Sequence, residues 1–223
     1  MLKAVIACGG TGGHITPALA IADMLKKNFN GAQIIFVGTK KGMENELVTA
    51  AGYAIKPLAV VGLPRKITPG ALRALYLAGQ AVREAKRFLR EVTPDLVIGT
   101  GGYACYPTLQ AATELRIPTA VHESNAVPGL AVRLLARRVD RVWLNFEEAG
   151  RYLGDKGRLL VVGNPLRGDI GSGAGRRPLP TGCRQMVLSF GGSLGAERIN
   201  AAMLSVMRRE LGHPEIYHLH AKG

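Results

Sequence analysis

The residues best suited to chemistry stand in the stretch GGTGGH, residues 9–14, where glycines surround a threonine and lead into a histidine. An apolar run precedes this stretch and an amphipathic pattern follows it, so it is predicted to join a strand to the start of a helix. Glycines there expose backbone N–H groups beneath the positive end of the helix dipole, an arrangement that binds phosphate. His14 stands beside this predicted anion site, where an imidazole can exchange a proton near neutral pH.

The spacing of the loop argues against a nicotinamide-dependent oxidoreductase. GGTGGH does not fit the G-x-G-x-x-G fingerprint of dinucleotide sites. The second predicted strand, residues 33–37, leads into Gly38 and Thr39, where such enzymes place the acidic residue that holds the ribose. For His14, the alternative to catalysis is a structural role in which the ring caps the helix or orients the loop.

Two further loops follow apolar runs that are predicted to be strands. Residues 99–103 read GTGGY, a second glycine loop, and residues 122–125 read HESN, four polar residues in a row. Loops at the carboxyl ends of strands in one open sheet form the crevice where such folds bind ligands. These loops are therefore candidate site segments. The alternative for the HESN segment is that Ser124 or Asn125 caps the next helix.

Composition favours a soluble α/β chain. The 223 residues are 47% hydrophobic, and helical and strand-like patterns alternate along them. No stretch has the length of a membrane span, and the N-terminus enters a strand without a signal peptide. The three cysteines show no ligand spacing, which fits a reducing cytoplasm.

The charge predicts an anionic partner. Lys and Arg number 29 against 16 Asp and Glu, giving a net charge of +13, so a phosphorylated substrate or an anionic membrane surface is favoured. Nucleic acid is the weaker choice, because the sequence shows no zinc pattern or recognition-helix signature and only 5% aromatic residues.

Residues 63–90 carry seven basic residues against one acid, together with apolar residues. This mixture suits the surface of an anionic bilayer, where each basic charge contributes about 1 kcal/mol. The alternative is the solvated face of an ordinary packing helix. The residues expected to meet the membrane are Arg65, Lys66, Ile67, Leu72, Arg73, Leu75 and Tyr76.

The strand and helix pattern restarts late in the chain. Residues 168–182 are rich in Gly, Pro and Arg, as linkers are. After them come a predicted strand, a third glycine loop, a helix and another strand. The predicted organisation is an N-terminal domain over residues 1–163, a linker over 164–184 and a partial second domain over 185–223.

Five motifs in a fixed order, GGTGGH, TGGY, HESN, GNPLR and GGSLGA, resemble those of the MurG family of bacterial glycosyltransferases. The resemblance covers essentially the whole chain. It implies an α/β fold of the GT-B type, in which a Rossmann-like acceptor and membrane-binding domain with a parallel sheet is followed by the beginning of a second, UDP-sugar-binding domain. It also implies a role in peptidoglycan synthesis, and so in cell wall biogenesis, cell shape and cell division.

The implied activity is that of an inverting hexosyltransferase. It would move N-acetylglucosamine from UDP-N-acetylglucosamine to the muramoyl 4-hydroxyl of lipid I, the undecaprenyl-pyrophosphoryl-muramoyl-pentapeptide, to form lipid II. The protein would work peripherally at the cytoplasmic face of the cell membrane, without a metal or other cofactor.

The resemblance also implies residue roles. His14 would be the general base, and Asn125 would hydrogen-bond the donor sugar. Arg167 and Ser193 would meet the donor diphosphate. Thr11, Gly12 and Gly13 would lie at the donor sugar and phosphates, and both N-terminal glycine loops would face the acceptor pyrophosphate. The remaining substrate-binding residues would be Gly102, Tyr103 and Glu123.

The sequence departs from the family at its end. Residues 185–223 suffice for about one βαβ unit, and Leu219 and His220 stand where the family has a Gln-Ser or Gln-Thr pair. A truncated transferase is therefore expected. The alternative is a non-catalytic module that binds lipid pyrophosphate or a membrane.

Overall fold

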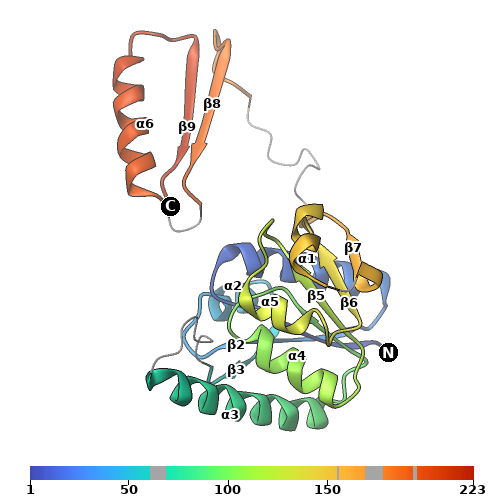
Figure 1. Cartoon of the computed structure of the whole chain (residues 1–223). Helices are drawn as coiled ribbons and strands as arrows, with labels where there is room; N and C mark the ends of the chain where they lie inside the picture. The colour runs from blue at the N-terminus through green and yellow to red at the C-terminus, as the bar shows by residue number, and fades with distance from the viewer. Residues whose placement is uncertain (61–68, 155, 169–177, 193–194) are drawn as a thin grey trace. The chain divides into compact units, whose positions relative to one another are not determined.

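The computed structural model describes residues 1–60, 69–154, 156–168, 178–192 and 195–223 (Figure 1). The chain divides into two compact units, Met1–Gly168 and Asp169–Gly223.

A parallel sheet of seven strands forms the centre of the first unit, in the order β3-β2-β1-β4-β5-β6-β7. The strands are β1 Lys3–Ala7, β2 Gln33–Thr39, β3 Ala54–Leu58, β4 Leu96–Gly99, β5 Thr119–Glu123, β6 Arg141–Leu144 and β7 Leu159–Val161. The helices are α1 Gly12–Asn28, α2 Glu44–Ala50, α3 Pro69–Val92, α4 Cys105–Glu114 and α5 Leu130–Leu135, with the 3-10 turns η1 Glu147–Tyr152 and η2 Lys156–Arg158.

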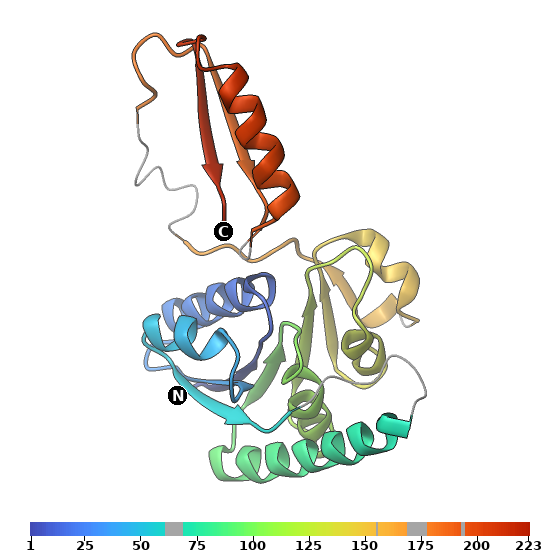
Figure 2. The ribbon, with the colours of Figure 1, turned by 90° about the vertical axis from the view of Figure 1, so that its left-hand side faces the viewer.

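Helices cover both faces of this sheet, because alternate residues of each strand point to opposite sides. Ile6 of β1 and Phe36 of β2 belong to one core, which packs on α1 and α2. Their neighbours Val5 and Val37 belong to the other core, which packs on α3, α4 and α5. Figures 1 and 2 show this three-layer arrangement. The predicted α/β class with a Rossmann-like parallel sheet is confirmed.

The strand order reverses direction between β1 and β4. The chain runs outward from β1 to β3 and returns to place β4 on the other side of β1, with Val5 paired to Ile35 on one side and to Val97 on the other. At such a reversal the loops that follow the two central strands diverge and leave a crevice. Both N-terminal glycine loops start there, at the carboxyl ends of β1 and β4.

The second unit contains β8 Gln185–Phe190, α6 Glu197–Arg209 and β9 Ile216–Ala221. The two strands are parallel and in register from Gln185 opposite Ile216 to Phe190 opposite Ala221. The predicted succession of strand, helix and strand is therefore observed.

Between α6 and this small sheet lies a polar contact. The His220 ring lies 2.8 Å from the Ser189 hydroxyl through Nδ1 and 3.0 Å from Asn200 Oδ1 through Nε2. Along β9, the half-buried residues Ile216, His218 and His220 alternate with the exposed residues Tyr217, Leu219 and Ala221. The helix thus covers one face of the two-stranded sheet.

Two local features differ from the sequence-based expectation. β5 continues through His122 and Glu123, so these two residues are buried strand residues. α5 starts at Leu130 with Gly129 as its N-cap. Capping by Ser124 or Asn125, the alternative considered for the HESN segment, is therefore wrong.

Candidate functional site

The two N-terminal glycine loops pack against each other backbone to backbone. Gly102 has φ +84°, and a Cβ atom there would lie 2.1 Å from the carbonyl oxygen of Gly9. Gly101 has φ +107°, and its Cβ would lie 2.4 Å from Nδ1 of His14. Glycine is needed at both positions because any side chain would both strain the backbone and displace the first loop.

Reciprocal hydrogen bonds tie His14 to the second loop. His14 Nδ1 donates to the carbonyl oxygen of Thr100 at 2.9 Å, and the Thr100 hydroxyl donates to the carbonyl oxygen of His14 at 2.7 Å. A carbonyl oxygen only accepts, so Nδ1 carries the proton and Nε2 of the neutral ring keeps a free lone pair. This geometry makes Nε2 the nitrogen that can accept a proton from a ligand.

The start of α1 presents free backbone donors. Among the described residues no acceptor meets the N–H groups of Thr11, Gly12 and Gly13, as expected for the first turn of a helix. Thr11 is the N-cap, and its side chain makes no capping bond. Three N–H groups without an acceptor among the described residues thus lie at the positive end of the α1 dipole, next to His14 in the chain, and this suits an anion.

Behind the first loop lies a buried carboxylate that sequence analysis missed. The Glu44 side chain accepts hydrogen bonds from the Gly10 N–H at 3.2 Å and from the N–H and hydroxyl of Thr39 at 2.7 Å each. Burial by itself raises the pKa of Glu44, but the hydrogen bonds from Thr39 and Gly10 outweigh it and hold the pKa below the ordinary glutamate value. Glu44 is therefore ionised at neutral pH.

The HESN segment joins the first loop through Ser124. The Ser124 hydroxyl lies 3.3 Å from the carbonyl oxygen of Gly13 and 3.4 Å from Nδ1 of His122. On its other side, His122 donates from Nε2 to the carbonyl oxygen of Gly163 at 3.0 Å. A buried imidazole thus links the segment after β7 to the glycine loop.

Glu123 organises the turn that carries Asn125. Its carboxylate accepts from the N–H and the side-chain amide of Asn125 at 2.9 and 2.8 Å, and from the N–H of Gly129 at 2.9 Å. Glu123 is 2% exposed, whereas Asn125 is exposed. Asn125 is thus an exposed residue, and the buried Glu123 holds it in place.

Lowering the pH is expected to destabilise the first unit through His122. Burial lowers the pKa of His122 below its ordinary value of 6.5, and the charge of His14 adds a smaller lowering. The hydrogen bond to Gly163 and the charge of Glu123 raise the pKa, but they do not offset the burial. As the pH falls below 6.5, the unfolded chain therefore binds a proton that the folded chain does not. Stability should fall by up to about 1.4 kcal/mol per pH unit until the folded pKa is reached.

Urea unfolding at several pH values between about 7.5 and 5.5 measures this dependence. The variant His122→Gln should lose that part of the slope. His213→Gln, which removes an exposed histidine, should keep it. An unchanged slope in His122→Gln would contradict the assignment to His122.

Arg167 is held against α1. Its Nε lies 3.7 Å from an oxygen of Asp23, whose other oxygen accepts a 2.6 Å hydrogen bond from the Tyr53 hydroxyl. Burial and the Asp23 contact raise the pKa of Tyr53, so the phenol stays a donor. About 44% of the Arg167 side chain is exposed, which leaves it available to a ligand.

The other predicted site residues are placed in part. Tyr103 is 59% exposed beside Gly102, and Tyr76 on α3 is 62% exposed. Ser193 lies outside the described residues, as do Arg65, Lys66 and Ile67. Leu72, Arg73 and Leu75 belong to α3, but their side chains are outside the described part.

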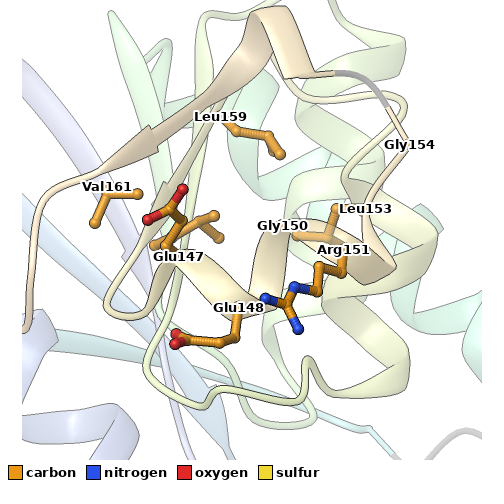
Figure 3. Close-up of a pocket in the computed structure, with 9 residues that line it drawn as sticks. Glu147, Glu148, Gly150, Arg151, Leu153, Gly154, Leu159 and Val161 are labelled. Carbon is orange, nitrogen blue, oxygen red and sulfur yellow. The ribbon is translucent and has the colours of Figure 1, made fainter.

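A separate pocket of about 640 Å³ lies beside β6, η1 and β7 (Figure 3). Leu144, Leu153 and Leu159 contribute its apolar lining, and Glu147 and Glu148 bring carboxylates to it. It shares no lining residue with the glycine loops or the HESN segment. The candidate site is therefore the loop cluster at the ends of β1, β4 and β5.

Two cysteines stand beside the glycine loops. Cys8 and Cys105 are both fully buried. Burial raises the pKa of both thiols, to about 12 for Cys105, so neither is a thiolate at neutral pH. They act as small core residues.

Comparison with known proteins identifies a family model and close relatives. Residues 4–144 match the model described as "Glycosyltransferase family 28 N-terminal domain". A protein of Thermoanaerobacter sp. is 43% identical over 213 residues, which cover 94% of this chain and 58% of the relative. A protein of Acetivibrio thermocellus is 39% identical over 226 residues, which cover 100% of this chain and 61% of the relative.

Both relatives carry the name UDP-N-acetylglucosamine--N-acetylmuramyl-(pentapeptide) pyrophosphoryl-undecaprenol N-acetylglucosamine transferase. Among solved structures, the crystal structure of Acinetobacter baumannii MurG matches with a TM-score of 0.72 and 27% identity, covering 100% of this chain and 59% of that one. The chain thus spans about 60% of the length of the relatives it matches.

Proposed function

The chain belongs to the family of the glycosyltransferase family 28 N-terminal domain, and on this premise we propose that it forms the acceptor side of a lipid II synthase. The proposed reaction moves N-acetylglucosamine from UDP-N-acetylglucosamine to the muramoyl 4-hydroxyl of lipid I. The names of the relatives support this choice of substrates. Residues 1–163 would be the acceptor domain, 164–184 the linker and 185–223 part of the donor domain.

The bonding of His14 is the observation that carries the proposal. Donation of the Nδ1 proton to Thr100 O leaves Nε2 free as a general base. Nε2 would take the proton of the acceptor hydroxyl while its oxygen bonds to the anomeric carbon. The acceptor oxygen attacks from the face opposite UDP, so the configuration inverts, and the bond from the anomeric carbon to the UDP oxygen breaks with its electron pair going to the departing UDP.

The free donors of the first loop support a phosphate contact. The N–H groups of residues 11–13, next to His14 in the chain, have no protein acceptor among the described residues. They would bind phosphate oxygens of the substrates, with Gly102 and Tyr103 completing the crevice. Asn125 would hydrogen-bond the donor sugar, since Glu123 fixes its amide nitrogen and leaves its carbonyl oxygen free.

The diphosphate of the donor would meet Arg167 and Ser193. The half-exposed guanidinium of Arg167 can exchange its long contact with Asp23 for phosphate oxygens, which bind Arg more strongly when bidentate. The glycine loop of residues 191–196 precedes α6, whose dipole would stabilise the charge on the departing UDP.

The proposed location is the cytoplasmic face of the membrane, with peripheral binding. None of the described helices is long and apolar enough to cross a bilayer. The net charge of +13 and the basic segment around α3 support attraction to anionic lipid.

Replacing Arg65, Lys66 and Arg73 together by Ser is expected to weaken binding to phosphatidylserine vesicles. At about 1 kcal/mol per charge, the loss is about a hundredfold in partition coefficient. Vesicle flotation measures it. The matched control, Arg184, Arg198 and Arg208 replaced by Ser, makes the same charge change in the second unit. Equal loss in both triple variants would show that net charge alone binds the membrane.

The proposed function is tested by calorimetric titration of UDP-N-acetylglucosamine into two proteins. One is this chain, and the other is this chain extended with the remaining C-terminal residues of the Thermoanaerobacter relative. The extended chain should bind the donor and transfer the sugar to a lipid I analogue. Failure of that transfer would contradict the enzyme proposal. Vesicle or pyrophosphate binding without transfer would favour the non-catalytic module.

A further inference from the structure

Glu44 lies in a space that three glycines from separate segments leave open. Its side chain is 0% exposed. A Cβ atom at Gly9, Gly38 or Gly42 would lie 2.8, 2.6 or 2.0 Å from side-chain atoms of Glu44. The Glu44 carboxylate thus fits between three segments that each have a glycine at the contact: the loop after β1, the end of β2 and the turn before α2.

That carboxylate joins two segments far apart in sequence. One oxygen accepts from the Gly10 N–H in the first glycine loop, and the other accepts from the N–H and hydroxyl of Thr39 at the end of β2. Asn45 secures the same turn by donating from its side-chain amide to the carbonyl oxygens of Thr39 at 2.8 Å and Gly42 at 3.0 Å. The loop is therefore anchored at Gly10.

This anchoring decides which N–H groups a ligand can meet. The Gly10 N–H is turned to Glu44, whereas those of residues 11–13 have no acceptor among the described residues. We propose that Glu44 is a positioning residue that holds the first glycine loop, so that the N–H groups of residues 11–13 face the phosphate and His14 stays against Thr100. The consequence for the ligand rests on the proposed function; the anchoring of the loop does not.

A direct ligand role for Glu44 is excluded by its burial and charge. A carboxylate without exposed surface cannot contact a substrate, and its negative charge would repel an anionic substrate. Three hydrogen bonds to the carboxylate compensate for its burial. Glu44 therefore acts through the loop.

Titration of the wild-type chain by NMR tests the anchoring. The backbone amide resonances of Gly10 and Thr39 should shift together with the side-chain carboxyl carbon of Glu44, at a midpoint below the ordinary glutamate pKa. Amide resonances of Gly10 that do not follow the Glu44 carboxyl would overturn the proposal.

Variants give a second measurement. In Glu44→Gln, the amide nitrogen replaces one carboxylate oxygen and faces either the Gly10 N–H or the two donors of Thr39. Because the link between the two segments is lost in either case, hydrogen exchange of the Gly10 or the Thr39 amide should accelerate by about tenfold or more. The matched control Glu46→Gln changes an exposed glutamate of the same helix and should leave both amides unchanged. If Glu44→Gln does not fold, Thr39→Val, which removes only the hydroxyl donor, should accelerate the exchange of the Gly10 amide. Unchanged exchange in the folded variant would overturn the proposal.

Inorganic pyrophosphate separates this inference from the proposed function. In the wild-type chain it should perturb the amides of residues 11–13 and leave that of Gly10 in place, and Glu44→Gln or Thr39→Val should weaken its binding. If pyrophosphate perturbs no loop amide in the wild type, the proposed phosphate site fails, while the titration still decides the role of Glu44. If a variant shows faster exchange of the Gly10 amide but binds pyrophosphate as the wild type does, the proposal that Glu44 positions the loop for the phosphate is overturned.

Discussion

His14→Ala is expected to lower the turnover number of the extended chain by about 10²- to 10⁴-fold, the usual contribution of a general base. The reason is geometric. His14 Nδ1 donates to Thr100 O at an N···O distance of 2.9 Å, so in the proposed reaction Nε2 would meet the acceptor hydroxyl, and alanine has no base in its place. Donor affinity should change little, because in the proposed complex backbone N–H groups rather than the ring would meet the phosphates. Steady-state kinetics with a lipid I analogue, together with calorimetry of the donor, separates the two effects.

Added imidazole distinguishes a base from a structural ring. Free imidazole should restore part of the activity of His14→Ala, since it can occupy the vacated space and accept the proton. His213→Ala, which removes an exposed histidine of the second unit, should retain wild-type turnover. A His14→Ala variant with unchanged turnover, or with donor affinity lost in the same proportion as turnover, would show that His14 only shapes the loop.

Apolar runs predicted the centre of the sheet well because the central strands β1, β4 and β5 are buried on both faces. Apart from Lys3 and Gln33, the runs over residues 2–8 and 33–37 are apolar, and the observed β1 and β2 lie within two residues of them. The same rule failed at β5. His122 and Glu123 are polar, so the strand was predicted to end before them, but hydrogen bonds to Gly163, Asn125 and Gly129 allow both to be buried.

Glu44 could not be found from its surroundings in sequence. It stands in the charged stretch KKGMENE, which is typical of an exposed helix start. Its burial depends on Gly9 and Gly38, which are close to it only in the folded sheet. The available signal was Thr39 at a strand end. The sequence has no ribose-binding acid directly at that strand end, whereas the structure brings Glu44 back to Thr39 from α2.

His14 was predicted from its place beside the glycines, but its partner was not. Thr100 belongs to the TGGY motif and was not considered as a site residue. Its role follows from the strand order, which puts β4 next to β1 and so brings the two loops together. That pairing requires tertiary structure, because Thr100 and His14 are 86 residues apart.

Gly102→Ala is expected to destabilise the first unit by about 2–4 kcal/mol and to remove transfer in the extended chain. Two costs combine. Alanine at a positive φ costs about 1 kcal/mol, and a Cβ atom 2.1 Å from Gly9 O must push two backbones apart, which costs about 1–3 kcal/mol further. The displacement falls on the loop that carries the free N–H groups and leads to His14. Urea unfolding measures the loss of stability. Transfer of the sugar to a lipid I analogue measures the loss of activity.

Gly52→Ala is the matched control for this change. Gly52 has φ +80°, close to the +84° of Gly102, but a Cβ atom there meets nothing within 4 Å. It should therefore cost only the backbone strain of about 1 kcal/mol and leave transfer intact. The difference between the two variants isolates the contact between the glycine loops. Equal destabilisation would mean that Gly102 is needed only for its backbone angle, and that the loops do not depend on their close packing to present His14.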